Sequence, residues 1–213
     1  MNEVTLEAVE SWARGELDRK NAAREQALRL SRELVRTCAN SIRAVHRHEF
    51  SSAQDLIAQA HHLNDEICRG LADDGDLYWA GYVQDAQKEL VEACCTFALV
   101  NCETLPQPST LGVAPAPFLN GLAEAVGELR RYTLDLLRRG ETDACERLLQ
   151  AMDDIYALLV TLDYPDALTG GLRRTTDSTR GILEKTRGDL TFALRQDALT
   201  RALQAAERAV ADA

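Results

Sequence analysis

Two glutamates, Glu89 and Glu92, stand three residues apart in the segment QDAQKELVEACCTFAL, residues 84–99. At about 100° per residue, a helix places both on one narrow stripe, beside an apolar arc. Carboxylates at positions i and i+3 meet above the same turn and can share one hard cation. The spacing therefore predicts a cation site at the margin of a core-facing surface. The alternative is a solvated helix face, because the chain has 34 acidic residues and charged side chains are usually exposed.

Further acids occur on two later segments that also have helical periodicity. In the segment of about 142–162, the apolar stripe includes Leu148, Met152 and Ile155. Asp153 points nearly opposite that stripe, whereas Asp154 lies at its edge. The helical wheel thus favours Asp154 as the acid at a core margin. In the segment of about 117–139, Glu128 lies roughly 100° from the centre of the apolar arc.

The elements that must position these acids are all predicted to be helices. Ala, Leu, Glu and Arg dominate the 213 residues, and all four are good helix formers. Four of the five prolines fall between 106 and 117, which predicts a linker there rather than a helix. The expected fold class is all-α, in one domain over residues 1–213. The helices are expected at about 5–48, 51–72, 76–103, 117–139, 142–162 and 169–211, with Ser51 or Ser52 as a cap, Gly140 as a C′ residue and possible weak points at Gly15, Gly181 and Gly188.

Composition excludes several classes of function. The net charge of −10 argues against a general nucleic-acid coat and against binding to an anionic membrane surface, although a local basic groove is still allowed. The N-terminus lacks a signal-peptide core and no segment suits a membrane span, so we expect a cytoplasmic protein without a membrane partner. The six cysteines form no zinc-binding spacing, and the Gly-rich phosphate loops and Glu-x-x-His di-iron motifs are missing.

Several sequence blocks together resemble the translin/TRAX family, most strongly over residues 24–195. The order of these blocks along an all-helical chain makes the set more specific than any one block. They are LSRELVR at 30–36, QKELVEA at 87–93, FLNGLAEAVGELRR at 118–131, the D-I-Y core of the fifth helix and GLRRTTD at 171–177.

This resemblance implies a seven-helix bundle that assembles into a hollow homo-oligomer, an octamer, and binds single-stranded RNA or single-stranded DNA. It further implies that TRAX-like subunits are metal-dependent endoribonucleases, whereas translin subunits lack the acidic site. Glu89 and Glu92 stand at the TRAX acidic positions, and the third TRAX acid falls on Asp154. The chain is therefore similar to the catalytic, TRAX-like type of subunit, and it resembles an archaeal or bacterial homologue of that type. Glu128 matches a Glu common to both branches, which suits a residue that supports the metal ligands or adds one more.

The resulting hypothesis is a Mg²⁺- or Mn²⁺-dependent endoribonuclease. Glu89, Glu92 and Asp154 would hold the ion, which would activate a water for attack on an RNA phosphodiester. The alternative is a non-catalytic, translin-like oligomer that binds single-stranded RNA or DNA. The chain lacks the long TRAX insert between the third and fourth helices, and Leu77, Tyr78 and Trp79 replace basic residues of translin. The arginines expected to contact nucleic acid are Arg43, Arg47, Arg130, Arg131, Arg173 and Arg174.

Overall fold

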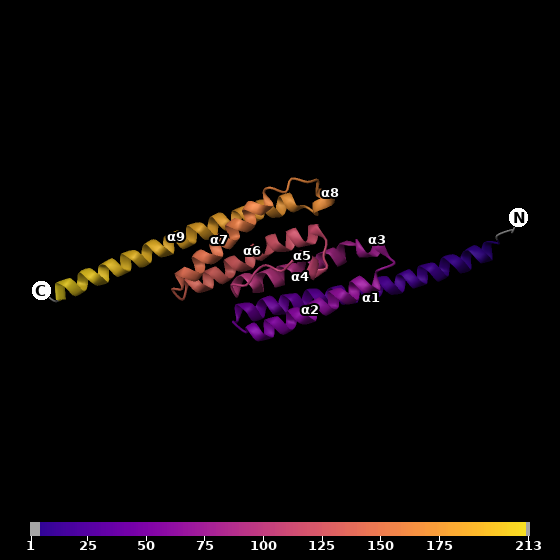
Figure 1. The fold of residues 1–213 in the computed structure, drawn as a ribbon, viewed down its shortest axis with the longest axis horizontal. Helices are drawn as coiled ribbons and strands as arrows, with labels where there is room; N and C mark the ends of the chain where they lie inside the picture. The colour runs from indigo at the N-terminus through magenta and orange to yellow at the C-terminus, as the bar shows by residue number, and fades with distance from the viewer. Residues whose placement is uncertain (1–4, 212–213) are drawn as a thin grey trace. The chain divides into compact units, whose positions relative to one another are not determined.

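The computed structural model describes residues 5–211, and every regular element in that range is a helix (Figure 1). The predicted all-α class is confirmed. Six helices have 18 residues or more and three have only four residues, whereas the resemblance implied seven helices. Their bounds are α1 Leu6–His46, α2 Phe50–Gly70, α3 Gly75–Tyr78, α4 Gly81–Val100, α5 Pro108–Leu111, α6 Pro115–Leu137, α7 Thr142–Leu159, α8 Asp166–Thr169 and α9 Leu172–Ala211.

Residue contacts divide the described chain into two compact units. The first comprises residues 5–93 and 107–118, and the second comprises residues 94–106 and 119–211. Helices α4 and α6 each begin in the first unit and end in the second. A single domain over residues 1–213 stays a prediction, and residues 1–4 and 212–213 lie outside the described range.

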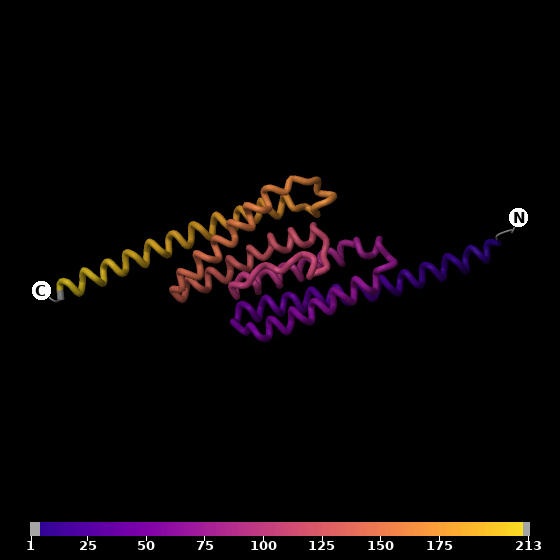
Figure 2. The backbone as a smooth tube through the Cα atoms, viewed as in Figure 1, coloured from indigo at the N-terminus to yellow at the C-terminus, as the bar shows by residue number. Residues whose placement is uncertain are grey.

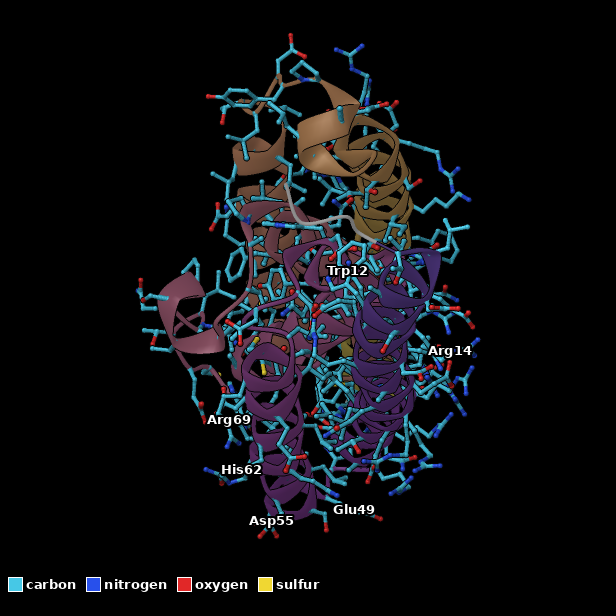
Figure 3. The ribbon with its side chains drawn as sticks, turned by 90° about the vertical axis from the view of Figure 1, so that its right-hand side faces the viewer. Trp12, Arg14, Glu49, Asp55, His62 and Arg69 are labelled. Carbon is cyan, nitrogen blue, oxygen red and sulfur yellow. The ribbon has the colours of Figure 1, made fainter. Side chains whose placement is uncertain are left out.

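Helices α1 and α2 pack side by side to form most of the first unit (Figure 1). Leu34, Cys38 and Val45 of α1 are fully buried and contribute to the core of this unit. Ala53 and Ala60 of α2 are also fully buried, and their small side chains allow the two helices to approach closely. The Ser41 hydroxyl donates a 3.0 Å hydrogen bond to the Ala53 carbonyl. Figure 3 views the molecule along its long axis, with Trp12 and Arg14 labelled on α1 and His62 and Arg69 on α2.

The helix expected at about 76–103 is in fact two helices, because the chain turns at Trp79 and Ala80 between α3 and α4. In one continuous helix, the Tyr78 carbonyl would accept from the backbone four residues later. Here it accepts instead from the Gln84 side-chain amide at 2.9 Å. Gly81, a poor helix former, begins α4. A local side-chain hydrogen bond therefore replaces a helical one. Competition of this kind for a backbone carbonyl cannot be predicted from hydrophobic periodicity.

Other boundaries also differ from those expected. The N-cap of α2 is Glu49 rather than Ser51 or Ser52, and the Pro-rich linker contains the single turn α5. The last segment is divided into α8 and α9 by Gly170 and Gly171, whose φ angles of 60° and 83° end one helix before the next begins. Gly140 has φ 77°, as predicted for a residue after a helix end. Helices α1 and α9 continue through Gly15, Gly181 and Gly188 without a break.

Helix α9 packs against α7 in the second unit. Leu148 and Met152 of α7 and Leu183 and Leu190 of α9 are almost entirely buried. The Arg130 guanidinium on α6 donates to the Thr186 hydroxyl at 3.1 Å and to the Asp189 carboxylate at 2.7 Å on α9. These contacts join three helices of this unit into one core.

Two long helices extend beyond their neighbours within their own units. The tube in Figure 2 shows the N-terminal part of α1 continuing past α2, and the C-terminal part of α9 continuing past α7. Most side chains of residues 5–26 and 195–211 are exposed. Within residues 5–211, none of the helices combines the length and apolar character that crossing a bilayer requires.

Candidate metal centre

The stripe that contains Glu89 and Glu92 passes from solvent into the protein interior along α4. Asp85 at its beginning is exposed, Glu89 and Glu92 are half-buried, and Thr96 is fully buried. Leu90, Val91 and Ala93 beside the two glutamates are buried to 1% exposure or less. The predicted position of these carboxylates at the margin of a buried surface is therefore observed.

The N-terminal half of α4 is anchored by a buried amide network. Gln87 is fully buried, and its side-chain amide donates to the side-chain oxygen Oδ1 of Asn64 on α2 at 3.1 Å. The Asn64 amide in turn donates to the Leu111 carbonyl at 3.0 Å. Buried amides of this kind fix the rotation of a helix, because each needs a partner of defined position. The network lies within two to five residues of Glu89 and Glu92 and so constrains the turn that carries them.

Three acidic side chains gather into one group among residues 5–211. Glu89, Glu92 and Glu124 each offer one carboxylate oxygen, and these oxygens all lie within 4.8 Å of one another. All three residues are half-buried. Oxygen ligands of Mg²⁺ or Ca²⁺ lie about 2.0–2.6 Å from the ion, so ligands on opposite sides are separated by about 4–5 Å. The spacing of the three oxygens thus matches a shared divalent cation.

Sequence reasoning missed Glu124. Its neighbours Leu122, Ala123 and Ala125 are almost completely buried, so Glu124 interrupts an apolar run on α6. An acid inside such a run was the available signal, because a charged side chain at a core margin usually has a partner or a ligand. The acid predicted on this helix was instead Glu128, one turn later, whose carboxylate lies 3.8 Å from the Arg131 guanidinium.

Asp154 is not a member of the three-carboxylate group in the described residues. It is exposed on α7 and accepts a 2.8 Å hydrogen bond from the Gln150 amide, one turn earlier. Its neighbour Asp153 forms an ion pair with Arg187 of α9 at 2.5 Å. The assignments of Asp154 as a ligand and of Glu128 as a supporting residue stay predictions.

Most of the arginines expected to contact nucleic acid already have partners within their own unit. Arg130 is the most buried, and its two contacts with α9 give it a structural role. Arg173 and Arg174 are exposed at the start of α9. The observed partners are Asn40 for Arg43, Glu49 for Arg47, Thr186 and Asp189 for Arg130, Glu128 for Arg131 and Asp163 for Arg173.

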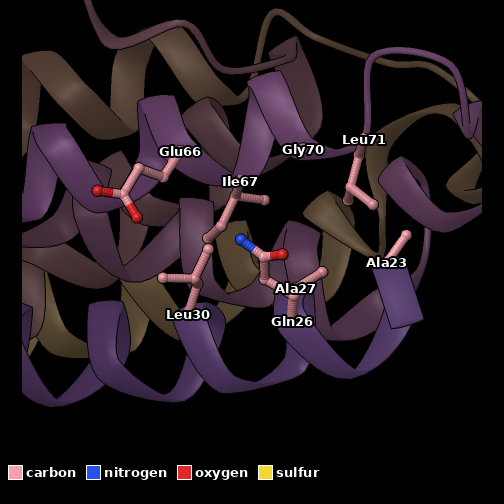
Figure 4. A pocket seen from close by; sticks show the side chains of 8 residues that line it. All are labelled: Ala23, Gln26, Ala27, Leu30, Glu66, Ile67, Gly70 and Leu71. Carbon is pink, nitrogen blue, oxygen red and sulfur yellow. The ribbon is translucent and has the colours of Figure 1, made fainter. Parts of the chain in front are cut away.

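Two hollows were compared with the space that a small-molecule ligand needs, and neither is large and enclosed. The cavity between α1 and α2 in Figure 4 has a volume of about 10 Å³ and lies beside Leu30, Ile67 and Leu71. A drug-sized or cofactor-sized ligand needs roughly 300–1,000 Å³. A wider depression, of about 530 Å³, is lined by α9 alone and is open to solvent. Compared with these two hollows, the carboxylate group has the clearer chemistry.

Fold and site together define an all-helical protein with a half-buried carboxylate group suited to a hard divalent cation. No family model matches the sequence. An uncharacterized protein of Methanocaldococcus jannaschii is 32% identical over 177 residues, which cover 82% of this chain and 78% of that protein.

Solved structures share the same fold. AfC3PO in a complex with duplex RNA is 34% identical, with a TM-score of 0.80, and the match covers 87% of this chain and 96% of that one. AfC3PO alone gives 33% identity and the same TM-score, covering 87% and 97%. NeC3PO without ligand, at 18% identity and TM-score 0.78, covers 90% and 100% and shows the fold. This chain belongs to the translin/TRAX family, to which these C3PO proteins also belong.

Proposed function

We propose that this protein binds RNA and is a Mg²⁺- or Mn²⁺-dependent endoribonuclease. The observation that carries the proposal is the group of three half-buried carboxylates, Glu89, Glu92 and Glu124, with oxygens within 4.8 Å of one another. Three acids held this close repel one another, and a divalent cation relieves that repulsion.

The donor set suits a hard cation. All three ligands are oxygens, whereas zinc sites usually combine Cys or His with few carboxylates. Mg²⁺ keeps several waters and takes its remaining ligands from carboxylates and substrate phosphate. When bound, the ion would lower the pKa of a water ligand and stabilise charge that develops on a phosphodiester. Glu89, Glu92 and Glu124 would hold it, with Asp154 as a further candidate.

The chain's own residues contribute position rather than covalent chemistry. The buried Gln87–Asn64 network fixes the turn of α4 that carries Glu89 and Glu92. Leu90, Val91 and Ala93 exclude water from one side of these carboxylates. Exposed arginines, with Arg173 and Arg174 as the first candidates, would hold the phosphate backbone through charge-assisted hydrogen bonds.

RNA as the substrate is supported by the similarity to AfC3PO, which has been solved with duplex RNA and is 34% identical to this chain. We also propose a hollow homo-oligomer, an octamer, whose interior would favour flexible single strands of RNA, with single-stranded DNA as a weaker ligand. The net charge of −10 requires that any RNA contact use a local group of arginines. The second candidate is a binding protein without catalysis.

The first prediction is that Glu89→Gln or Glu92→Gln abolishes cleavage of a labelled single-stranded RNA. Removing a partner that merely supports a metal ligand already costs about 10–100-fold in activity or affinity, so removing a ligand should cost more than about 100-fold. Cleavage rates would be measured with Mg²⁺, with Mn²⁺ and with EDTA, and a duplex of the same sequence would be run beside the single strand. RNA binding in EDTA should be unchanged.

Glu146→Gln is the matched control, because Glu146 is an exposed glutamate on α7 outside the carboxylate group. It should cleave at the wild-type rate. Mg²⁺-dependent cleavage that persists in both the Glu89 and Glu92 variants would overturn the metal centre. RNA binding by the wild-type protein without cleavage in either metal would establish the binding protein instead.

A further inference from the structure

The C-terminal part of α9 carries an apolar seam that the described chain leaves uncovered. Phe192, Leu199, Leu203 and Val210 are 70%, 60%, 57% and 78% exposed. They recur with Gln196 and Ala206 at alternating steps of four and three residues. This is the a/d repeat by which two helices pair as a coiled coil. We call these six positions, from Phe192 to Val210, the C-terminal seam.

The C-terminal seam lies on the opposite side of α9 from its core-facing stripe. Leu183 and Leu190 are 2% and 1% exposed and form that stripe, which packs in the second unit. At about 100° per residue, the seam lies roughly 170° around the helix from these two leucines. It is therefore a second apolar surface and not an extension of the core beyond the end of α7.

Charge is arranged to leave the seam apolar. Arg201 and Asp197 form an i,i+4 ion pair at 2.5 Å, with Arg201 on the side of α9 away from the seam. Residues 192–211 carry three arginines against two acids, so this arm is nearly neutral. Two such arms can approach each other without a large repulsion. An apolar seam on a nearly neutral, extended helix is the arrangement expected of a helix-pairing surface.

We infer that the C-terminal seam pairs with the same seam of a second copy of this chain, in an antiparallel two-helix coiled coil. Antiparallel pairing centred at residue 201 places Leu199 against Leu203 of the second copy, and Phe192 against Val210. Gln196 then meets Ala206. The Phe192–Val210 and Leu199–Leu203 layers then have nearly equal total volume, and the Gln196–Ala206 layer is smaller. Parallel pairing would place Phe192 against Phe192 and Ala206 against Ala206, which overfills one layer and leaves another under-filled.

Residues that flank the seam are compatible with the antiparallel arrangement. The positions beside the seam are Ala193, Arg195, Thr200, Ala202, Glu207 and Ala209. Antiparallel pairing brings Arg195 near Ala209 and Glu207 near Ala193, so no like charges meet. In an antiparallel pair, the N-terminal end of each helix lies beside the C-terminal end of the other, so the two helix dipoles attract each other. The contact is two-fold symmetric and closes after two copies.

The N-terminal part of α1 is the rival occupant. Leu6, Trp12 and Leu17 are 87%, 68% and 66% exposed there. Residues 5–18 carry four acids against one arginine, so two copies of this arm repel each other. Their apolar residues are interrupted by Glu16 and lack the unbroken a/d repeat of the C-terminal seam. The observations therefore favour pairing between two C-terminal seams.

The first test is the mass of the full-length chain in solution, with no RNA or added metal. Leu199→Asp/Leu203→Asp should lower the mass measured by light scattering by a factor of two or more. Ala198→Asp/Ala205→Asp is the matched control, because it adds the same charge to exposed positions outside the seam. The control should keep the wild-type mass, and both variants should keep the wild-type circular dichroism.

The second test is directed disulfide formation in a Cys102→Ser background, since Cys102 is exposed. Mixing Leu199→Cys protein with Leu203→Cys protein under mild oxidation should give a cross-linked dimer, whereas either protein alone should not. A dimer of Leu199→Cys alone would contradict the antiparallel orientation. Absence of the mixed cross-link, with a reduced mass in Trp12→Asp/Leu17→Asp, would assign the seam to the N-terminal arm and overturn the inference.

This inference deepens the proposed homo-oligomer and is independent of the nuclease. An oligomer that keeps its mass in Leu199→Asp/Leu203→Asp, and gives no mixed cross-link, would refute seam pairing while leaving assembly through other surfaces. RNA cleavage measured on the same variants separates this failure from a failure of the metal centre.

Discussion

The proposed metal site combines two carboxylates that are three residues apart with a third acid from another helix. Glu89 and Glu92 belong to one helix, and their proximity follows from helical geometry alone. Glu124 comes from α6 and completes a group with oxygens within 4.8 Å. Asp154, the acid that the resemblance favours, is exposed and hydrogen-bonded to Gln150. The third ligand is therefore assigned to Glu124 by the carboxylate geometry and to Asp154 by the family resemblance.

Separate variants of these two acids should tell them apart. Glu124→Gln is expected to weaken Mn²⁺ binding by more than about 100-fold, because it removes one of three oxygen ligands from a closely spaced group. Asp154→Asn should leave metal binding close to wild type if Asp154 only contacts solvent and Gln150. Isothermal titration with Mn²⁺ measures both. A wild-type affinity in Glu124→Gln, together with no measurable binding in Asp154→Asn, would transfer the third ligand to Asp154.

The cysteines provide a second contrast at the scale of single residues. Burial raises the pKa of the Cys94 thiol to about 12 and that of the Cys145 thiol to about 11. Since the thiolate is the nucleophile, these two should react very slowly with iodoacetamide at about pH 8, where Cys94 is roughly one part in 10⁴ ionised. Cys102 is exposed and should react first. Peptide mass mapping over time measures the order, and labelling of Cys94 as fast as Cys102 would contradict the structure.

At the scale of elements, helix ends depend on side chains that are distant in sequence. The Arg147 guanidinium on α7 donates to the Leu99 carbonyl at 2.8 Å and so satisfies the C-terminal end of α4. Asn120 on α6 donates to the Thr169 carbonyl of α8 and accepts from the Thr175 hydroxyl of α9, both at 2.8 Å. These polar contacts fix where helices end within the second unit.

An ion pair connects α1 to the start of α3 in the first unit. The Arg19 guanidinium donates to both Asp74 oxygens, at 3.0 and 3.1 Å, and Asp74 is 6% exposed. The hydrogen bond from Arg19 lowers the pKa of Asp74 below its usual value. Because the folded-state pKa is depressed, the pair stabilises the fold above the unfolded-state pKa of about 3.9 and loses this effect as the pH falls through the folded-state value.

Asp74→Asn should therefore lower the free energy of unfolding at pH 6, and the difference from wild type should shrink below about pH 4. Urea unfolding from pH 6 down to pH 3, followed by circular dichroism, measures this difference. Asp85→Asn is the control, because Asp85 is exposed on α4. A difference that stays constant over the whole pH range would show that the Asp74 charge does not contribute.

At the scale of the whole molecule, the proposed RNA binding requires an acidic chain to use a few arginines. Of the expected group, Arg130 is committed to Thr186 and Asp189, whereas Arg173 and Arg174 are exposed at the start of α9. Arg173 also pairs with Asp163, and both side chains are largely exposed, so solvent screens this pair and it can be exchanged for phosphate. A basic surface of this kind gives affinity that depends strongly on salt.

Arg173→Ala/Arg174→Ala should weaken single-stranded RNA binding and reduce the slope of log affinity against log salt by about 0.7 for each phosphate that the variant no longer neutralises. Fluorescence anisotropy at several KCl concentrations measures the slope. Arg130→Ala should mainly lower thermal stability, because its hydrogen bonds lie inside the second unit. An unchanged slope in the double variant would place the RNA-binding surface elsewhere.

The amino-acid sequence alone was enough to predict the features of the protein that depend on short-range periodicity. The all-helical class, the pairing of Glu89 with Glu92, and Gly140 beyond the end of α6 all follow from spacings of three or four residues or from the conformational freedom of glycine. The family resemblance found from short blocks was confirmed by 34% identity to AfC3PO over 87% of this chain.

Only the tertiary structure revealed the features that depend on contacts between residues distant in sequence. Glu124 entered the carboxylate group although no spacing connects it with Glu89. A Gln84 side chain ended the helix that periodicity predicted to continue through Tyr78, and Arg130 bound α9 rather than solvent. The helical repeat of the C-terminal seam can be seen in the sequence. Only the 57–78% exposure of its large apolar side chains distinguishes the seam from a core stripe. Periodicity reports which residues share a helix face, whereas burial and proximity depend on which other surface that face meets.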